Sequence, residues 1–423
     1  RTIGFRHIGV VPRHRWCRMR ELIYPNPIIL LLQQDDYEVF LNKKPLYYDE
    51  IDYARFPRIF NLVKLHLNLP PIIHIVGTNG KGSTGRFLAQ ILAGAGKKVG
   101  HYTSPHIFDF SERFYSSFEE IDKFRLNLAH NRLLEIFSLL NNTSEIVESL
   151  SYFEWATLMA GVIFEGYDFL ILEAGMGGEY DATNAFDKSL SIFTPIGLDH
   201  IDMLGSTIEE IAKTKLNSMQ NQALISSEFA CMELANQIAK QKSVRLIKQS
   251  EIYAKEIQNY AIKFNLPEFL RANLSLAVNA ANILNIENLA QIISNLGALT
   301  LRGRCEKIKP NLIIDVGHNA HAAKAIAQNL QNIGWREVNL IYNAFDDKDI
   351  FSVLLSLKPF IGKIHIYNYK SYSRKLATHK ITQIAKDLGI TCCEFTNLDE
   401  NEKYLVFGSF MLVENFIKEE IER

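Results

Sequence analysis

The sequence has few cysteines and no long apolar run. Its five cysteines lack the spacing of a metal-binding set and stand at Cys17, Cys231, Cys305, Cys392 and Cys393. An odd number of scattered cysteines favours free thiols in a reducing compartment over a disulfide framework. The apolar run at 27–32 is far shorter than the ~18 residues that indicate a membrane-spanning helix. We therefore expect a cytoplasmic protein without a membrane partner.

An excess of charge of either sign is also missing. The chain has 46 Lys and Arg against 47 Asp and Glu, a formal net charge of −1. This balance argues against a broad binding surface for nucleic acid or for anionic lipid. With 47% hydrophobic and 22% charged residues over 423 positions, the composition is that of a globular protein long enough for two domains.

The first twenty residues differ from the rest. They hold six arginines and no acidic residue. An Arg-rich, acid-poor segment is typical of a transit peptide, but no amphipathic helical pattern accompanies it, and an upstream arm is the alternative. We treat residues 1–35 as an N-terminal extension, possibly disordered, outside the fold.

A glycine-rich segment is the most informative feature present. It follows the apolar run at 71–76, precedes the helical pattern at 85–92, and reads Gly77, Thr78, Asn79, Gly80, Lys81, Gly82, Ser83 and Thr84. A strand, such a turn and a helix let backbone N–H groups and the helix dipole bind a polyphosphate. Lys81 would bind the β- and γ-phosphates, and the hydroxyl of Ser83 or Thr84 would reach a phosphate-bound Mg²⁺. A nucleotide site is therefore predicted.

Alternating strands and helices predict an α/β fold. The patterns indicate strands at 98–102, 168–174, 190–195, 222–226 and 244–247, helices at 152–165, 207–219 and 230–241, and a polar loop at 103–114. Thr207 and Glu210 have the spacing of a capping box. The pattern restarts with strands at 311–316, 338–342, 363–367 and 404–407, a helix through about 333 and a last helix to 420. We expect an N-terminal doubly wound P-loop ATPase domain over 36–298 and a smaller C-terminal Rossmann-like α/β domain over 299–423.

Polar residues stand where the predicted strands end. Glu173 closes the strand at 168–174, Asp199 and His200 follow the next strand, and Ser104 and His106 follow the strand at 98–102. Ligands of doubly wound sheets bind at such ends. Glu173 and the Ser104 hydroxyl suit Mg²⁺, whereas a lone histidine such as His200 is more often a structural hydrogen-bonding group.

The residue order of the glycine-rich loop, with a glycine between Lys81 and Ser83, resembles that of the nucleotide-binding loop in amide ligases, namely the Mur ligases and folylpolyglutamate synthase/dihydrofolate synthase. Further blocks resemble that family in the same order: 103–106 with 110–114, 173–178 with 181–184, and 196–200. The resemblance implies metal contacts from Ser104, Glu173 and His200. It also aligns Lys215 with a lysine that the family modifies to a carbamate, so Lys81, His200 and Lys215 are the expected catalytic residues.

The resemblance continues to about residue 415. Blocks at 271–273, 301–306 and 315–319 are similar to those that bind ATP, which implies roles for Asn273, Arg304, Asp315 and His318; blocks at 346–349 and 407–410 also match. The acceptor site implied by the family consists of Thr103, Pro105, His106, Phe110, Arg113 and Phe153. Four positions depart from the family pattern: Glu179 replaces an arginine, Arg302 replaces a proline, and Thr214 and Asn217 differ near Lys215.

These features predict an ATP-dependent ligase that joins L-glutamate to a folate or pteroate carboxylate through an acyl phosphate, with ATP and Mg²⁺ as cofactors. Its partners would be dihydropteroate or a reduced folate and L-glutamate, and we expect a monomer. A Mur-type ligase that acts on a peptidoglycan precursor is the nearest alternative. A nucleotide-binding switch is less favoured, because no Asn-Lys-x-Asp segment follows the loop. The choice between dihydrofolate synthesis and polyglutamylation, the linkage and the chain length stay open.

Overall fold

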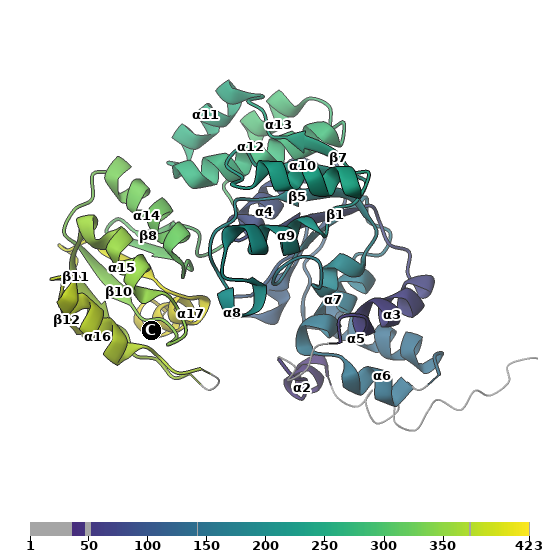
Figure 1. Ribbon diagram of the computed structural model, residues 1–423, viewed down its shortest axis with the longest axis horizontal. Helices are drawn as coiled ribbons and strands as arrows, with labels where there is room; N and C mark the ends of the chain where they lie inside the picture. Colours follow the sequence, from purple (N-terminus) through teal and green to yellow (C-terminus); the bar gives the residue numbers. More distant parts are fainter. Residues whose placement is uncertain (1–35, 47–51, 142, 372–373, 423) are drawn as a thin grey trace, which may run out of the picture.

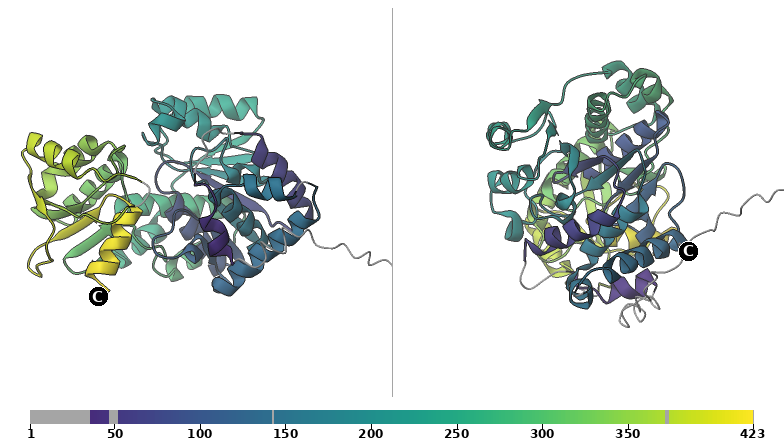
Figure 2. Two further views of the ribbon diagram at one scale, coloured as in Figure 1. Left: turned by 90° about the horizontal axis from the view of Figure 1, so that it is seen from below. Right: turned by 90° about the vertical axis from the view of Figure 1, so that its right-hand side faces the viewer.

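The chain folds around two β-sheets that lie in separate lobes (Figure 1). A computed structural model describes residues 36–46, 52–141, 143–371 and 374–422. The predicted extension at 1–35 lies outside the described residues. The view from below in Figure 2 also separates the two lobes.

The sheet of the first lobe has seven strands in the order β3-β2-β4-β1-β5-β6-β7. Its strands are β1 Ile72–Val76, β2 Val99–Tyr102, β3 Phe114–Ser116, β4 Phe169–Glu173, β5 Lys188–Phe193, β6 Gln222–Ile225 and β7 Arg245–Lys248. All pairings are parallel except that of the edge strand β3 with β2. Because β1 lies between β4 and β5, the connections leave it in both directions, which creates a ligand-binding crevice at its carboxyl end.

Helices cover both faces of this sheet. The helices of the first lobe are α2 Tyr37–Asn42, α3 Arg55–Val63, α4 Lys81–Gly94, α5 Lys123–Ser138, α6 Thr143–Ser149, α7 Tyr152–Ile163, α8 Ile201–Leu204, α9 Ile208–Leu216, α10 Met232–Gln241, α11 Ala254–Lys263, α12 Glu268–Ile283 and α13 Leu289–Asn295. Successive strand residues point to opposite faces. Ile73 and Ile75 accordingly pack with α4 and α12, whereas Ile72 packs with α3 and α7.

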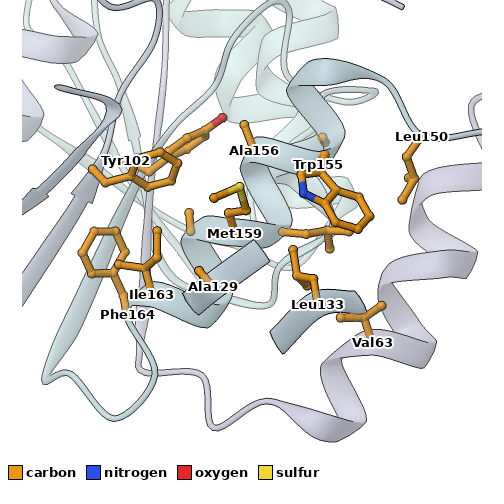
Figure 3. Packing of buried hydrophobic residues seen from close by; sticks show 14 of the residues in the cluster. Val63, Tyr102, Ala129, Leu133, Leu150, Trp155, Ala156, Met159, Ile163 and Phe164 are labelled. Carbon is orange, nitrogen blue, oxygen red and sulfur yellow. The ribbon is translucent and has the colours of Figure 1, made fainter. Parts of the chain in front are cut away.

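A large aromatic core lies beneath α7. Figure 3 shows Trp155, Met159 and Ile163 of this helix directed into it, with Leu133 of α5 and Phe164 nearby. These side chains are fully or almost fully buried. Burying one large apolar side chain contributes about 1.5–3 kcal/mol, so this core holds the loops at the carboxyl ends of β2 and β4 on a rigid base.

The second lobe has a six-stranded sheet in the order β12-β11-β10-β13-β9-β8, which is parallel apart from the edge pair β8–β9. Its strands are β8 Glu306–Lys309, β9 Leu312–Asp315, β10 Val338–Tyr342, β11 Ile361–Ile366, β12 Thr391–Glu394 and β13 Tyr404–Phe407. One face packs on α14 Ala320–Asn332, α15 Ile350–Leu357 and α16 Thr378–Asp387, and the other packs on α17 Phe410–Glu420.

The predicted α/β fold is confirmed, and so are the predicted strands and helices to within a few residues. Thr207 accepts from the backbone N–H of Glu210, whose side chain returns the bond, so the predicted capping box is present. The polar loop expected at 103–114 is wrong in part, because Phe110–Arg113 form a 3₁₀ turn and β3 begins at Phe114. Asp109 and Glu112 cap that turn reciprocally, a local bond that composition did not reveal.

The described part of the chain also bears on the expectations for thiols and for membrane-spanning helices. Its four cysteines are free thiols, and none of its helices is long and apolar enough to cross a membrane.

Candidate functional site

The glycine-rich loop connects β1 to α4 at the crevice between the lobes. Gly80 adopts a left-handed conformation with φ 84°, and a Cβ there would lie 2.6 Å from the Asn273 side-chain oxygen. Only glycine fits both the backbone angle and the close approach of α12. Apart from Thr84, which is buried with its hydroxyl unpaired, every loop residue from Gly77 to Ser83 lines one cavity. The predicted nucleotide loop therefore forms the floor of a cavity.

Lys81 is the first residue of α4, and its side chain is 15% exposed. Its Nζ donates to the carbonyl oxygen of Thr78 at 3.3 Å and lies 4.0 Å from Glu173 Oε1. Both contacts are long for a lysine, so the ammonium is free to turn toward a phosphate. The cavity also contains Asn273, which the resemblance assigned to ATP.

The residues expected to hold a metal line the same cavity: Ser104, Glu173 and His200. Glu173 is buried, and the hydroxyl of Thr103 donates to its Oε2. Within the described ranges no three His, Cys, Asp or Glu side chains stand close enough to hold a metal alone. One carboxylate, a hydroxyl and an imidazole suit a cation such as Mg²⁺, which keeps waters and shares phosphate oxygens. The donor set fits that ion.

His200 lies at the junction of the lobes. It adopts a left-handed conformation with φ 51° ahead of α8, an uncommon state for a residue with a Cβ. Partial burial, with repulsion from Lys348, lowers the pKa of His200 to about 4, while Asp199 opposes the shift. The ring is therefore neutral near pH 7, which is the form that binds a cation.

Side chains of the second lobe contact the carboxylate of Asp199. Lys348 Nζ donates to its Oδ1 at 3.0 Å, and His318 Nε2 lies 3.3 Å from its Oδ2. Burial opposes ionisation, but the hydrogen bond and charge of His318 hold the pKa of Asp199 well below its usual range. Asn319 also reaches Asp199 Oδ2, at 3.4 Å. The carboxylate therefore connects the two lobes.

Lys215 lies beneath the glycine-rich loop. It is 4% exposed, and its Nζ donates to the carbonyl oxygen of Gly77 at 3.0 Å. Burial, followed by the charge of Lys81, lowers the pKa of Lys215 to about 7. A large fraction of the amine is then neutral at physiological pH, the form that reacts with carbon dioxide. The alternative of a solvent-exposed helix charge does not describe this side chain.

Three of the four family departures meet next to Lys215. Asn217 Nδ2 donates to Glu179 Oε2 at 2.8 Å, and the Glu179 backbone N–H donates to the Thr214 carbonyl oxygen at 2.9 Å. The fourth, Arg302, donates to Glu306 Oε1 at 2.7 Å. The side chain of Glu179 therefore has a neutral amide as its hydrogen-bond donor and that of Arg302 has a carboxylate as its acceptor, whereas the contact of Thr214 is made by its backbone.

The second lobe brings Arg304, Asp315 and His318 to the nucleotide cavity. Burial lowers the pKa of Arg304, although Asp315 and Glu173 oppose the shift, and an arginine remains charged at neutral pH. Asp315 accepts backbone N–H bonds from Cys305 at 2.8 Å and Gly317 at 2.7 Å. Burial raises the pKa of Asp315, and the charge of Arg304 counteracts this.

One contact across the cavity was not predicted as such. Asn79 and Asn319 exchange side-chain hydrogen bonds of 3.1 Å in both directions, and Asn79 Nδ2 also lies 2.8 Å from His321 Nδ1. Asn319 stands in the block at 315–319, which could have flagged it, whereas no pattern marked His321. The glycine-rich loop therefore touches the second lobe directly.

A larger cavity of about 1000 Å³ adjoins the first. Of the residues predicted for the acceptor, Pro105, His106, Arg113 and Phe153 line it. Thr103 does not, because its hydroxyl is bonded to Glu173. Phe110 does not either: its ring is buried, with its centroid 5.3 Å from that of Tyr37.

The same cavity is lined by an aromatic pair that sequence reasoning missed. The ring centroids of Tyr53 and Tyr180 lie 4.1 Å apart, and the two residues are 53% and 56% exposed. Exposed aromatic rings on a cavity wall offer a stacking surface to a flat ligand. No local signal in the sequence indicates that these two residues meet.

Comparison with known proteins supports the family and the fold that the sequence resemblance implies. Residues 75–290 match the Mur ligase middle domain. The dihydrofolate synthase/folylpolyglutamate synthase of Buchnera aphidicola subsp. Schizaphis graminum is 30% identical over 383 residues, which cover 83% of this chain and 88% of that protein. The Haemophilus influenzae protein of the same name is 30% identical over 82% of this chain and 88% of its own length.

Solved structures of proteins with related names have a similar fold. The crystal structure of Helicobacter pylori folylpolyglutamate synthetase is 39% identical in sequence, with a TM-score of 0.73 over 90% of this chain and 97% of that one. Escherichia coli FolC in complex with ADP is 25% identical, with a TM-score of 0.73 over 90% of this chain and 96% of that one.

Proposed function

The chain belongs to the dihydrofolate synthase/folylpolyglutamate synthase family of the Mur ligases, and from this premise we propose that it is an ATP-dependent ligase that joins L-glutamate to a pteroate or folate carboxylate. The observation that carries the proposal is the junction of the two cavities. Both are lined by Ser104, Pro105, Gly175, Met176, His200, His318 and Phe410. A phosphoryl group on the nucleotide side can therefore meet a carboxylate on the acceptor side.

The residues around the first cavity suit ATP, and those around the second suit a folate-like acceptor. The glycine-rich loop, Lys81 and Arg304 suit a polyphosphate. The apolar wall of the second cavity, including Phe153 and the Tyr53–Tyr180 pair, suits flat aromatic rings. The name of the E. coli structure states that it contains ADP, and the curated relatives carry both activities in their names. We infer the same two activities here.

The reaction follows from these positions. The acceptor carboxylate attacks the γ-phosphorus, ADP leaves, and the glutamate amine displaces phosphate from the acyl phosphate to form the amide. Lys81 and Arg304 neutralise the charge that the transferred phosphoryl group carries. Lys348 and His318 hold the second lobe against Asp199, which restricts water at the reacting atoms.

Ser104, Glu173 and His200 would hold a divalent cation, which when bound supplies positive charge to the phosphate oxygens. Lys215 would be carbamylated, because its buried and largely neutral amine can take up carbon dioxide. A carbamate would replace the positive charge of Lys215 near Lys81 with oxygens, which attract a lysine or a cation instead of repelling it.

The experiment is ADP release by the purified protein with ATP, Mg²⁺ and L-glutamate, comparing 7,8-dihydropteroate with tetrahydrofolate. We expect turnover with each acceptor. Turnover with one acceptor alone would restrict the proposal to that activity. Absence of turnover with both, from protein that still binds ATP, would contradict the proposal and favour a Mur-type acceptor.

We also propose that the protein is a cytoplasmic monomer whose domains extend over 36–298 and 299–423. The free thiols of the described residues suit a reducing compartment, and the two separate sheets suit two domains. Light scattering coupled to gel filtration measures the mass in solution, and a mass of twice 48.4 kDa would contradict the monomer.

A further inference from the structure

The segment that links the lobes is held by the helix that follows the nucleotide loop. Gln90 of α4 donates from Nε2 to the carbonyl oxygen of Ala298 at 3.0 Å, and its Oε1 accepts the backbone N–H of Thr300 at 3.1 Å. Arg86, one turn earlier on the same face, donates to the Thr300 carbonyl oxygen at 2.5 Å. Three backbone groups of the linker are therefore bound by two side chains of one helix.

Arg86 is itself fixed in place. It is 5% exposed, its Nε donates to His101 Nδ1 at 3.3 Å, and its guanidinium carbon lies 4.0 Å from the centre of the Tyr115 ring. Arg86 stands only five positions after Lys81 on α4, so the linker is attached to the same helix that carries the nucleotide-loop lysine.

The other end of the linker belongs to the second lobe. The Gly303 carbonyl oxygen accepts the backbone N–H of Val316 at 3.0 Å, and the Cys305 N–H donates to Asp315 Oδ2 at 2.8 Å. Between these two attachments lie Leu301 and Arg302. In the described part of the chain, no backbone hydrogen bond ties either residue to a lobe. The backbone of these two residues can therefore change conformation, while the Arg302 side chain, bonded to Glu306 of β8 at 2.7 Å, stays with the second lobe.

We propose that Arg86 and Gln90 are positioning residues that fix the first-lobe end of a two-residue hinge, Leu301–Arg302, and thereby place Arg304 against the nucleotide phosphates. This inference rests on the proposed function. Arg304 stands two residues beyond the hinge, so rotation there moves its guanidinium relative to Lys81. Because Arg86 and Gln90 hold Thr300 in place, the rotation starts from a defined position of the chain. Without the bonds from Arg86 and Gln90, the free segment lengthens toward Gly297 and Arg304 loses its defined position.

The test uses Gln90→Ala, because Gln90 is partly exposed and its replacement by a good helix former leaves α4 intact. We expect kcat for ADP release to fall about 10-fold, as for a misplacement of a reacting group, while the Kd for ADP stays unchanged. Hydrogen exchange of the Thr300 amide should become faster. Gln383→Ala on α16, which removes an exposed amide bond to Asp387 of 2.9 Å, is the matched control and should change none of these.

A double-mutant cycle separates positioning from general damage. Arg304→Ala alone should lower kcat about 100-fold, and adding Gln90→Ala should cost nothing more, because the group to be positioned is gone. Equal losses in both backgrounds, or a Gln90→Ala enzyme with wild-type kcat, would overturn the inference. Arg86→Lys, which keeps the charge but not the geometry of the guanidinium, should reproduce the fall in kcat.

The failure of the proposed function has a different signature. If the wild-type protein does not turn over any folate acceptor, or if Arg304→Ala retains full activity, the assignment of the reaction or of Arg304 is wrong. If Arg304→Ala is impaired and Gln90→Ala is not, only the positioning role is wrong.

Discussion

The first lobe brings seven consecutive residues, Gly77–Ser83, to the nucleotide cavity, whereas the second lobe brings a shorter run, 315–318, together with Arg304 and Phe410 from distant positions. The first lobe can therefore bind a polyphosphate largely through one loop and its backbone. The run at 315–318 has no lysine, and the second lobe instead adds the side chains of Arg304 and His318 to a nucleotide already held. The difference indicates that nucleotide binding depends mainly on the first lobe, whereas the reaction needs residues of both lobes, so a change in the second lobe should lower turnover more than nucleotide binding.

Removing the charge of Lys81 should have the largest effect. In Lys81→Ala the loop keeps its backbone shape but loses the cation expected at the β- and γ-phosphates. We expect ADP release to fall by about 10³-fold or more, measured under saturating acceptor. Circular dichroism should show an unchanged fold, because Lys81 makes only long contacts. Near-normal turnover would contradict the nucleotide assignment of the first lobe.

Glu173→Gln should be the next most severe change. The amide keeps the size of the carboxylate and an acceptor for Thr103, but it loses the charge that attracts a divalent cation. We expect the Mg²⁺ concentration needed for half-maximal rate to rise about 10–100-fold. An Mg²⁺ titration that coincides with that of the wild type would argue against Glu173 as a metal ligand.

Breaking a contact between the lobes tests the contribution of the second lobe to the reaction. Lys348→Met removes the 3.0 Å ion pair with Asp199, which is mostly buried, with side chains 13% and 12% exposed. Of the second-lobe residues that the structure describes, Asp199 then keeps only His318 and Asn319 as partners. We expect the lobes to be held less precisely and kcat to fall about 10-fold, while ADP binding to the first lobe persists.

The matched control for this variant is Lys123→Met. Its ion pair with Glu38 is also 3.0 Å long, but the side chains are 56% and 46% exposed. Exposed pairs contribute about 0–1 kcal/mol, so turnover should not change. If both variants behave alike, the contact between Lys348 and Asp199 has no role in the reaction.

Local patterns predicted the first lobe's part of the site well. The strand, glycine loop and helix at 71–92 are contiguous, and strand-end residues such as Glu173 and Ser104 converge because parallel strands end at one edge. The sequence gives no comparable signal for contacts that form only on folding. Asn79 meets Asn319 from 240 positions away, and Tyr53 meets Tyr180 across two loops. Phe110 carried a family pattern, yet it packs in the core, because a buried aromatic and a ligand-binding aromatic look alike in sequence.

The smallest effect we predict concerns stability and belongs to the first lobe alone. The pKa of Lys215 falls from 10.5 to about 7 on folding, with burial the main cause. Between these two pH values the unfolded chain binds more protons at this residue than the folded chain does. The free energy of unfolding should therefore rise with pH in this window, by about 1 kcal/mol per pH unit from this group.

Lys215→Met removes that dependence, because methionine fills a similar volume without a titratable amine. Urea unfolding of the uncarbamylated protein, in buffer free of carbon dioxide, at pH 7 and at pH 9 should show the wild type gaining stability relative to Lys215→Met. If the two proteins instead respond to pH in parallel, the amine is not buried in its neutral form, and the carbamate we propose loses its physical basis. A second-lobe variant such as Lys348→Met should keep the wild-type pH response, since that lysine lies outside the pocket beneath Gly77. The same pair of measurements therefore tests whether the special environment of Lys215 is a property of the first lobe by itself.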